Sequence, residues 1–207
     1  MNYIFIQARM SSKRLPGKVL LNLGNKTVLG HIIYQLKRVR NKKRIIVLTS
    51  SNKSDDLIAK FCKQKKITYF RGDLNNVYKR YIQAIKKFKN KMFVRINGDS
   101  PMINYKLIDN AIRIFKSKKY DLVTNCQFRS FPKGQSVEII NSKIFVKNFK
   151  FIKTKRDKEH VFLYFYKNFS KFKIFNILSK LNNKNKNQSI DTIKDYLLIK
   201  KLIEKHK

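Results

Sequence analysis

Short β-branched or aromatic runs alternate with amphipathic stretches over the first half of the chain, and this alternation constrains the fold most strongly. Strand-like runs cover residues 3–6, 44–49, 68–70 and 92–96. Apolar residues at helical spacing follow them in 28–39, 54–65, 76–88 and 105–117. Strands that are separated by helices predict an α/β fold in which a mostly parallel sheet carries helices on both faces.

Size and composition agree with one such domain. The chain has 207 residues and 43% hydrophobic residues, so it is long enough to bury a core and is not a disordered chain. No repeat or Pro/Gly/Ser-rich linker divides it, and we expect a single domain over 1–207 with an exposed loop at 182–188. No apolar run reaches the roughly 20 residues of a membrane span, and no secretion signal is visible. We therefore expect a cytoplasmic protein without a membrane partner.

The charge is strongly basic, with a formal net value of +37. Such a charge ordinarily indicates a nucleic acid or an anionic membrane surface as the partner. Here, however, the basic residues are mostly lysines spread through every segment, whereas nucleic-acid-binding proteins more often gather them on one face among aromatic residues. We expect no specific nucleic-acid partner. Cys62 and Cys126 are isolated, and we expect both to be reduced core thiols.

A basic loop follows the first strand, with the sequence Gln7-Ala-Arg-Met-Ser-Ser-Lys-Arg-Leu-Pro-Gly-Lys18. Its arginines and lysines can bind phosphate oxygens, and the N–H groups of successive turn residues can form an anion-binding nest. The Pro-Gly pair fixes the backbone before Lys18. The loop predicts a triphosphate site, although from charge alone a solvated loop in a lysine-rich protein is an equally good interpretation.

A second candidate segment, Asn97-Gly-Asp-Ser-Pro101, lies where the fourth strand is expected to end. Ligands of open parallel sheets bind at the carboxyl ends of strands. A carboxylate at this place, Asp99, can hold a metal ion. From these residues alone an aspartate in an Asx-turn or at a helix N-cap is the preferred interpretation.

The order of these features resembles the cytidylyltransferases that make CMP-activated acidic sugars, and most closely the branch named for spore-coat polysaccharide biosynthesis. The loop keeps the family pattern R-x-x-S-x-R-x-P-x-K at Arg9, Ser12, Arg14, Pro16 and Lys18. The resemblance implies a Rossmann-like fold of the nucleotide-diphosphosugar-transferase type and a loop that binds CTP. The residues implied to bind the nucleotide are Gln7, Ala8, Arg9, Ser12, Arg14, Lys18, Arg71 and Asn97, with Arg14 and Lys18 also catalytic.

The resemblance also implies a Mg²⁺ site. The stretch Asp191-Thr-Ile-Lys-Asp195 is similar to the family signature V-D-T-P-x-D, with Ile193 in place of the usual proline. In that family Asp191 would join Asp99 on the metal, and Asp195 would support the start of a final helix at 196–204, which a short β-like piece precedes. Two carboxylates at strand ends suit Mg²⁺, which completes its shell with phosphates and water. A helix-capping role for Asp191 stays open.

Two further motifs match with departures. In the stretch 70–81, similar to F-R-G-x-x-x-D-V-L-x-R-Y, Asn76 replaces an aspartate, and Arg71 is either a nucleotide contact or a surface arginine. The stretch 131–138 is similar to F-P-x-G-L-D-V-E, and the resemblance implies that Gln135, Ser136 and Glu138 contact the acceptor sugar, although the first two depart from the pattern.

A last motif, Arg156-Asp-Lys-Glu-His-Val161, resembles R-E-H-V. It contains His160, which is either an acid or base or a hydrogen-bonded histidine at a helix start. Taken together, the motifs predict transfer of CMP from CTP to an acidic sugar with release of diphosphate. A catalytically weakened relative that only binds nucleotide is the second hypothesis, and a nucleic-acid-binding module is the third. By analogy with the family we expect a homodimer.

Overall fold

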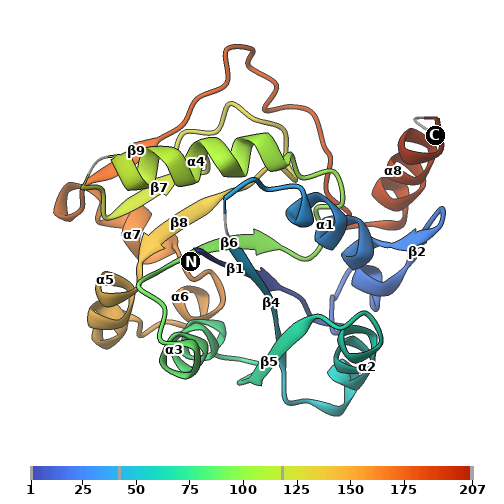
Figure 1. Cartoon of the computed structure of the whole chain (residues 1–207), viewed down its shortest axis with the longest axis horizontal. Helices are drawn as coiled ribbons and strands as arrows, with labels where there is room; N and C mark the ends of the chain where they lie inside the picture. Colours follow the sequence, from blue (N-terminus) through green and yellow to red (C-terminus); the bar gives the residue numbers. More distant parts are fainter. Residues whose placement is uncertain (1, 42, 118, 206–207) are drawn as a thin grey trace.

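The computed structural model describes residues 2–41, 43–117 and 119–205 (Figure 1). Its strands are β1 (Asn2–Gln7), β2 (Asn22–Leu23), β3 (Lys26–Thr27), β4 (Lys43–Ser50), β5 (Thr68–Gly72), β6 (Met92–Asn97), β7 (Leu122–Thr124), β8 (Glu138–Asn141) and β9 (Ile174–Asn176). Its α-helices are α1 (Val28–Lys37), α2 (Asp56–Gln64), α3 (Val77–Phe88), α4 (Tyr105–Ser117), α5 (Ser142–Lys147), α6 (Lys155–Glu159), α7 (Leu163–Lys167) and α8 (Ile193–Lys205). Short 3₁₀ helices cover Lys18–Leu20, Lys53–Asp55, Asn148–Phe151 and Phe169–Lys171.

The main sheet has seven strands in the order β5-β4-β1-β6-β8-β7-β9. All pairings in it are parallel except those of β8, which runs antiparallel to both of its neighbours. The mostly parallel sheet predicted from the sequence is confirmed. The chain builds outward from β1 through β4 to β5 and then returns to place β6 on the other side of β1. This reversal makes the carboxyl ends of β1 and β6 the place where an open sheet of this kind binds ligands.

Helices cover both faces of the sheet, as predicted, and each face has its own core (Figure 1). Helices α1, α2, α4 and α8 bury residues such as Ile32, Ile108 and Ile199 on one face, whereas α3, α5 and α7 bury an aromatic cluster on the other. Along β1, Ile4 and Ile6 belong to the first core and Phe5 to the second. Side chains alternate along a strand, so a strand buried on both faces has a continuous apolar sequence.

The segment before α8 differs from the prediction. Residues 189–192 form no strand, and the helix begins at Ile193 instead of residue 196. The cause is Asp195, whose carboxylate accepts hydrogen bonds from the backbone N–H groups of Asp191 and Thr192 at 3.0 and 2.8 Å. Asp195 therefore supports the helix start, as the sequence motif predicts.

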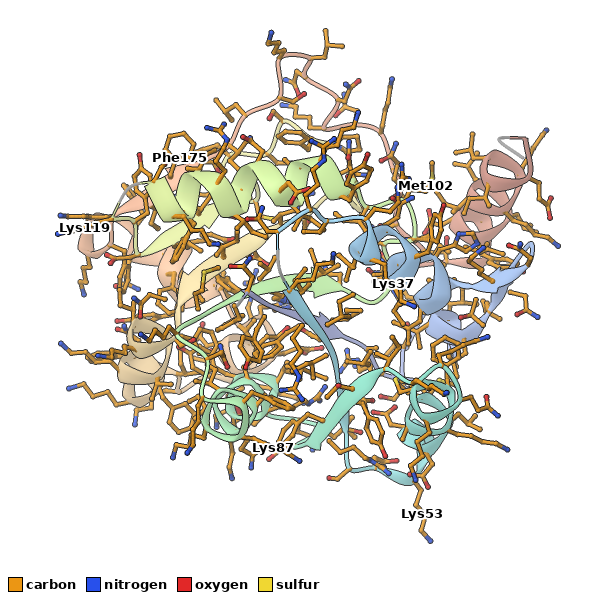
Figure 2. The ribbon with its side chains drawn as sticks, in the orientation of Figure 1. Lys37, Lys53, Lys87, Met102, Lys119 and Phe175 are labelled. Carbon is orange, nitrogen blue, oxygen red and sulfur yellow. The ribbon has the colours of Figure 1, made fainter. Side chains whose placement is uncertain are left out.

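Basic side chains are dispersed over the surface. Figure 2 shows Lys53, Lys87 and Lys119 pointing outward from different edges of the molecule. This dispersion agrees with the interpretation of the charge as a property of the whole surface. Within the described ranges, no helix has the length and apolar character needed to cross a bilayer.

Candidate active site

A cleft of about 460 Å³ opens at the carboxyl ends of β1 and β6. The two strands end side by side, with Gln7 paired to Asn97. The next residue, Gly98, lies so close to β1 that a Cβ atom there would come within 2.7 Å of the Gln7 carbonyl oxygen. The predicted residues that line the cleft are Gln7, Arg9, Ser12, Arg14, Lys18, Asn97, Asp99 and Asp191. The structure thus brings together residues that are far apart in the sequence.

The loop after β1 folds back on itself. The backbone N–H groups of Ser12 and Gly17 both donate to the carbonyl of Met10, at 2.9 and 2.8 Å. Gly17 has a φ of 72°, a left-handed conformation that glycine adopts without strain. The loop is therefore a compact structure that carries its cations on a defined backbone.

Asp55 ties this loop to the end of β4. Its carboxylate accepts a hydrogen bond from the Met10 N–H at 2.7 Å and another from the Ser50 N–H at 2.9 Å, and its side chain is fully buried. Burial alone raises the pKa of Asp55, but the hydrogen bonds from Met10 and Ser50 outweigh it and hold the pKa below the ordinary value. The sequence contains no local signal for this anchor, because Met10 and Asp55 are 45 residues apart.

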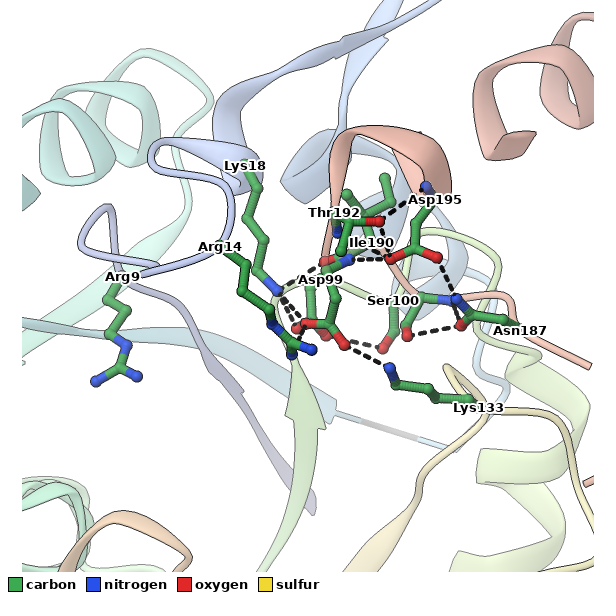
Figure 3. A network of polar contacts seen from close by, with 12 residues as sticks. Arg9, Arg14, Lys18, Asp99, Ser100, Lys133, Asn187, Ile190, Thr192 and Asp195 are labelled. Atoms are coloured by element: carbon green, nitrogen blue, oxygen red, sulfur yellow. Dashed lines mark hydrogen bonds and ion pairs between the residues drawn. The ribbon is translucent and has the colours of Figure 1, made fainter. Parts of the chain in front are cut away.

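Lys18 lies between the two predicted metal ligands (Figure 3). Its Nζ is 2.6 Å from Asp99 Oδ2 and 2.9 Å from Asp191 Oδ1, and it also donates to the Ile190 carbonyl at 2.6 Å. The side chain is largely buried, so the ammonium ion is directed at the carboxylates by the packing around its stem. The two aspartates therefore converge on one point at the base of the cleft.

Asp191 also receives Arg14, with Nη2 at 3.0 Å, and Lys133, with Nζ at 2.5 Å. Burial alone raises the pKa of Asp191, but the hydrogen bonds from Lys133 and Lys18 lower it to about 2. Two carboxylates that converge on a cation are a suitable donor set for Mg²⁺, which uses one or two carboxylates together with substrate phosphates. The described residues contain no cluster of three or more acidic, histidine or cysteine side chains that would form an all-protein cage.

Arg9 forms an ion pair across the mouth of the cleft with Glu159, at the end of α6. The atoms Arg9 Nη2 and Glu159 Oε1 are 2.8 Å apart, and this hydrogen bond lowers the pKa of Glu159. Glu159 and the next residue, His160, both line the cleft. His160 follows the end of α6, so its expected position at a helix start is wrong, and it lines both the cleft and a second pocket.

A buried network forms the wall between this cleft and a second pocket. Arg95, on β6, pairs with Glu138, on β8, and its Nε donates to Gln7 Oε1 at 3.1 Å. The Tyr166 hydroxyl donates to Glu138 Oε1 at 2.6 Å. Burial alone would lower the pKa of Arg95, but the adjacent carboxylate of Glu138 raises it. Both carboxylate oxygens of Glu138 are thus engaged by Arg95 and Tyr166, which is typical of a side chain that positions its neighbours.

The second pocket has a volume of about 300 Å³ and shares Arg95, Asn97 and His160 with the cleft. The predicted acceptor residues Ser136 and Glu138 line it. It also contains Arg129 and Arg156, for which the sequence motifs predict no role. Neither guanidinium group forms an ion pair with a carboxylate of the described residues. The pocket therefore presents two uncompensated cations.

Cys126, expected in the core, is a free cysteine that instead lies partly exposed on the wall of the second pocket. Its side chain contacts Asn125 Oδ1 at 3.4 Å. The other cysteine, Cys62, is buried in the core as expected.

Two predicted site residues lie elsewhere. Arg71 donates to the carbonyl groups of Ser50 and Asn52, each at 2.9 Å, and pairs with Asp56, so its guanidinium group holds the end of β5 and does not line the cleft. Gln135 is buried, and its amide bonds to the backbone of Met102 and Asn104. These bonds turn it away from both pockets.

Ala8 is buried behind the cleft, where only its backbone can serve a ligand, and its N–H already donates to the Leu48 carbonyl at 3.1 Å.

Residues 3–206 match the family model described as cytidylyltransferase. The chain is 34% identical over 203 residues to the uncharacterized protein MJ1063 of Methanocaldococcus jannaschii, a match that covers 97% of this chain and 82% of the relative. It is 27% identical to the spore coat polysaccharide biosynthesis protein SpsF of Bacillus subtilis, with 97% and 85% covered. The resemblance found in the sequence is therefore confirmed over nearly the whole chain.

Solved structures agree. A cytidylyltransferase from Leptospira borgpetersenii superposes with a TM-score of 0.95 at 32% identity, covering 99% of this chain and 87% of that one. The synthetase of CMP-2-keto-3-deoxy-manno-octonic acid, solved with CTP, has the same fold, with a TM-score of 0.73 at 14% identity and coverage of 100% and 99%. The chain thus belongs to the cytidylyltransferase family, the nucleotidyltransferases that use CTP.

Proposed function

We propose that this protein transfers CMP from CTP to an acidic sugar of the nonulosonate or 3-deoxy-octulosonate kind, in surface polysaccharide synthesis. The observation that carries the proposal is the arrangement of two adjoining pockets at the reversal point of the sheet. One is lined by the cationic loop and two carboxylates, and the other contains Arg129 and Arg156. The names of the relatives, SpsF and a 3-deoxy-manno-octulosonate cytidylyltransferase, support the same substrate class.

The first pocket suits the nucleotide. Arg9, Arg14 and Lys18 come from one loop on a fixed backbone, so their charges can meet the phosphates without a large reorganisation. Gln7 and Asn97, at the paired strand ends, provide amide groups for the base or ribose. Asp99 and Asp191 would hold Mg²⁺ against the phosphates. When bound, that ion would withdraw electron density from the α-phosphate and neutralise part of the triphosphate charge.

The second pocket suits the acceptor. Arginine forks bind carboxylates bidentately, and two guanidinium groups without a carboxylate partner among the described residues favour an anionic acceptor over a neutral one. The two pockets share Arg95 and Asn97 in their lining, so an acceptor in the second pocket would lie beside a nucleotide in the first. A sugar hydroxyl would then attack the α-phosphorus while the bond to the bridging oxygen breaks and its electron pair leaves with diphosphate. Arg14 and Lys18 would stabilise the charge on that leaving group.

Diphosphate release tests the proposal. The purified protein is incubated with Mg²⁺, one of CTP, UTP, ATP or GTP, and a panel of acidic sugars beside their neutral analogues. The expected result is release with CTP and at least one acidic sugar and none with its neutral analogue. Release with neutral sugars alone, or with all four nucleotides equally, would contradict it. If Arg156→Ala turns over with the wild-type KM for the acceptor, the second pocket is not where the acceptor binds.

A further inference from the structure

Lys133 is a charged side chain at the site to which the sequence motifs give no role. It stands in the segment between β7 and β8, and its Nζ lies 2.5 Å from Asp191 Oδ2. It does not line the nucleotide cleft. Figure 3 shows Lys18 and Arg14 approaching the carboxylates from one side and Lys133 from the other.

The backbone around Lys133 is held firmly against the segment that carries Asp191. The Lys133 N–H donates to the Lys186 carbonyl at 2.9 Å, and the Lys133 carbonyl accepts from the Gln188 N–H at 2.7 Å. Gly134 has a φ of 95°, and a Cβ atom there would come within 2.5 Å of the Gln188 backbone. The two segments therefore form one unit, and the ammonium group of Lys133 is anchored close to its partner.

The bonds of Asp191 divide between its two oxygens. Arg14 and Lys18 both bond Oδ1, whereas Lys133 bonds Oδ2. Of the residues that the structure describes, these three are the ones whose side chains bond this carboxylate. Arg14 and Lys18 belong to the loop that we assign to the phosphates, so bound CTP competes for them. Lys133 stands outside that loop and keeps its contact.

We propose that Lys133 is a positioning residue, which fixes Asp191 with Oδ1 toward the cleft when the nucleotide and Mg²⁺ bind. The inference rests on the proposed function. Carboxylates that bind metals commonly have a partner on the other oxygen, and loss of such a partner typically costs about 10- to 100-fold in metal affinity or activity. Because the Lys133 side chain is 48% exposed, the ion pair contributes little to folding stability.

Manganese binding provides a readout other than activity. Free Mn²⁺, a paramagnetic substitute for Mg²⁺, is followed by electron paramagnetic resonance with the full chain in excess over CTP, and the uptake of Mn²⁺ by CTP alone is subtracted. For Lys133→Met we expect a Kd for Mn²⁺ at least about 10-fold above wild type. Lys133→Arg should recover most of the loss, and the control Lys184→Met, which removes one exposed positive charge from the nearby loop, should bind as wild type does. All variants should unfold at nearly the same temperature.

Kinetics supply the second readout. The Mg²⁺ concentration that gives half-maximal rate should rise at least about 10-fold in Lys133→Met, while KM for CTP at saturating Mg²⁺ stays within about twofold. Unchanged or tighter Mn²⁺ binding by Lys133→Met would overturn the inference, and tighter binding would show that Lys133 competes with the metal. If the wild-type protein itself takes up no Mn²⁺ with CTP, the metal site of the proposed function fails, and the role of Lys133 fails with it.

Discussion

Replacing Asp55 with alanine removes the contact that holds the nucleotide loop to the end of β4. The carboxylate accepts from the N–H groups of Met10 and Ser50 at 2.7 and 2.9 Å and from the Ser50 hydroxyl at 2.5 Å. Among the described residues, no other hydrogen bond between the loop and the end of β4 is as short as the bond from Met10 to Asp55. Asp55→Ala should therefore both destabilise the fold and loosen the loop that carries Arg9, Arg14 and Lys18.

The expected loss of stability in Asp55→Ala follows from the N–H donors that lose their acceptor. A buried donor that loses its partner costs about 1–3 kcal/mol, and Asp55 leaves two backbone N–H groups without an acceptor. We expect a loss of about 3 kcal/mol, because Met10 is only half-buried and water replaces part of its bond. That is a large share of the roughly 5–15 kcal/mol by which a domain is stable.

Urea unfolding measures the loss of folding free energy, and titration with CTP measures how well the loop binds the nucleotide. The matched control is Asp56→Ala, which removes the same charge from the next residue, where the side chain is mostly exposed and pairs with Arg71. We expect Asp56→Ala to stay within about 1 kcal/mol of wild type and to bind CTP normally. A loss below about 1 kcal/mol for Asp55→Ala, or equal losses for both variants, would refute the role of Asp55 as the anchor.

Three further predictions concern the site. Asp99→Asn should fold normally and lose Mg²⁺-dependent turnover by at least about 100-fold. Circular dichroism checks the fold and a diphosphate-release assay checks the turnover. Normal turnover would remove Asp99 from the mechanism. Arg129→Ala and Arg156→Ala should each raise KM for the acidic sugar about 10-fold or more, since a charged hydrogen bond contributes about 1.5–3 kcal/mol, and leave KM for CTP unchanged; an unchanged acceptor KM would contradict the assignment of the second pocket. The pKa values of Asp55 and Asp191 are lowered in the fold, that of Asp191 to about 2. The stability that both carboxylates contribute should therefore be present above about pH 4 and be lost as the pH falls toward 2. Urea midpoints measure this loss, and a midpoint that stays constant over that range would contradict it.

The sequence predicts the part of the fold that is built from long periodic elements. The β1–α4 half has strands and helices whose apolar spacing is unambiguous, and α4 ends where its pattern ends. In the other half the final helix was predicted, but the strands were missed, because β7 and β9 have three residues each and β8 four, too few for a period of two to be recognised. Pairing with neighbours in the sheet, and not local preference, makes them strands.

The sequence also predicts the residues whose chemistry is local to a motif. The loop and both aspartates line one cleft, and Asn76 caps α3 by accepting from the Lys79 N–H at 2.9 Å, so its replacement of an aspartate leaves that cap in place. Long-range partners were not predictable. Arg95 lies in an apolar strand and gives no separate signal, although it joins both pockets. Arg71 keeps its motif position, yet its orientation is decided by carbonyl groups that only the fold places near it.

The most direct measurement of the central claim is ³¹P nuclear magnetic resonance of a mixture of the protein, CTP, Mg²⁺ and an acidic sugar that supports diphosphate release. Attack on the α-phosphorus predicts that the three CTP resonances give way to one phosphodiester resonance of a CMP-sugar and to diphosphate in equal amounts. Formation of CDP and inorganic phosphate, or of diphosphate with free CMP in place of the diester, would show that the cleft does not join CMP to the acceptor.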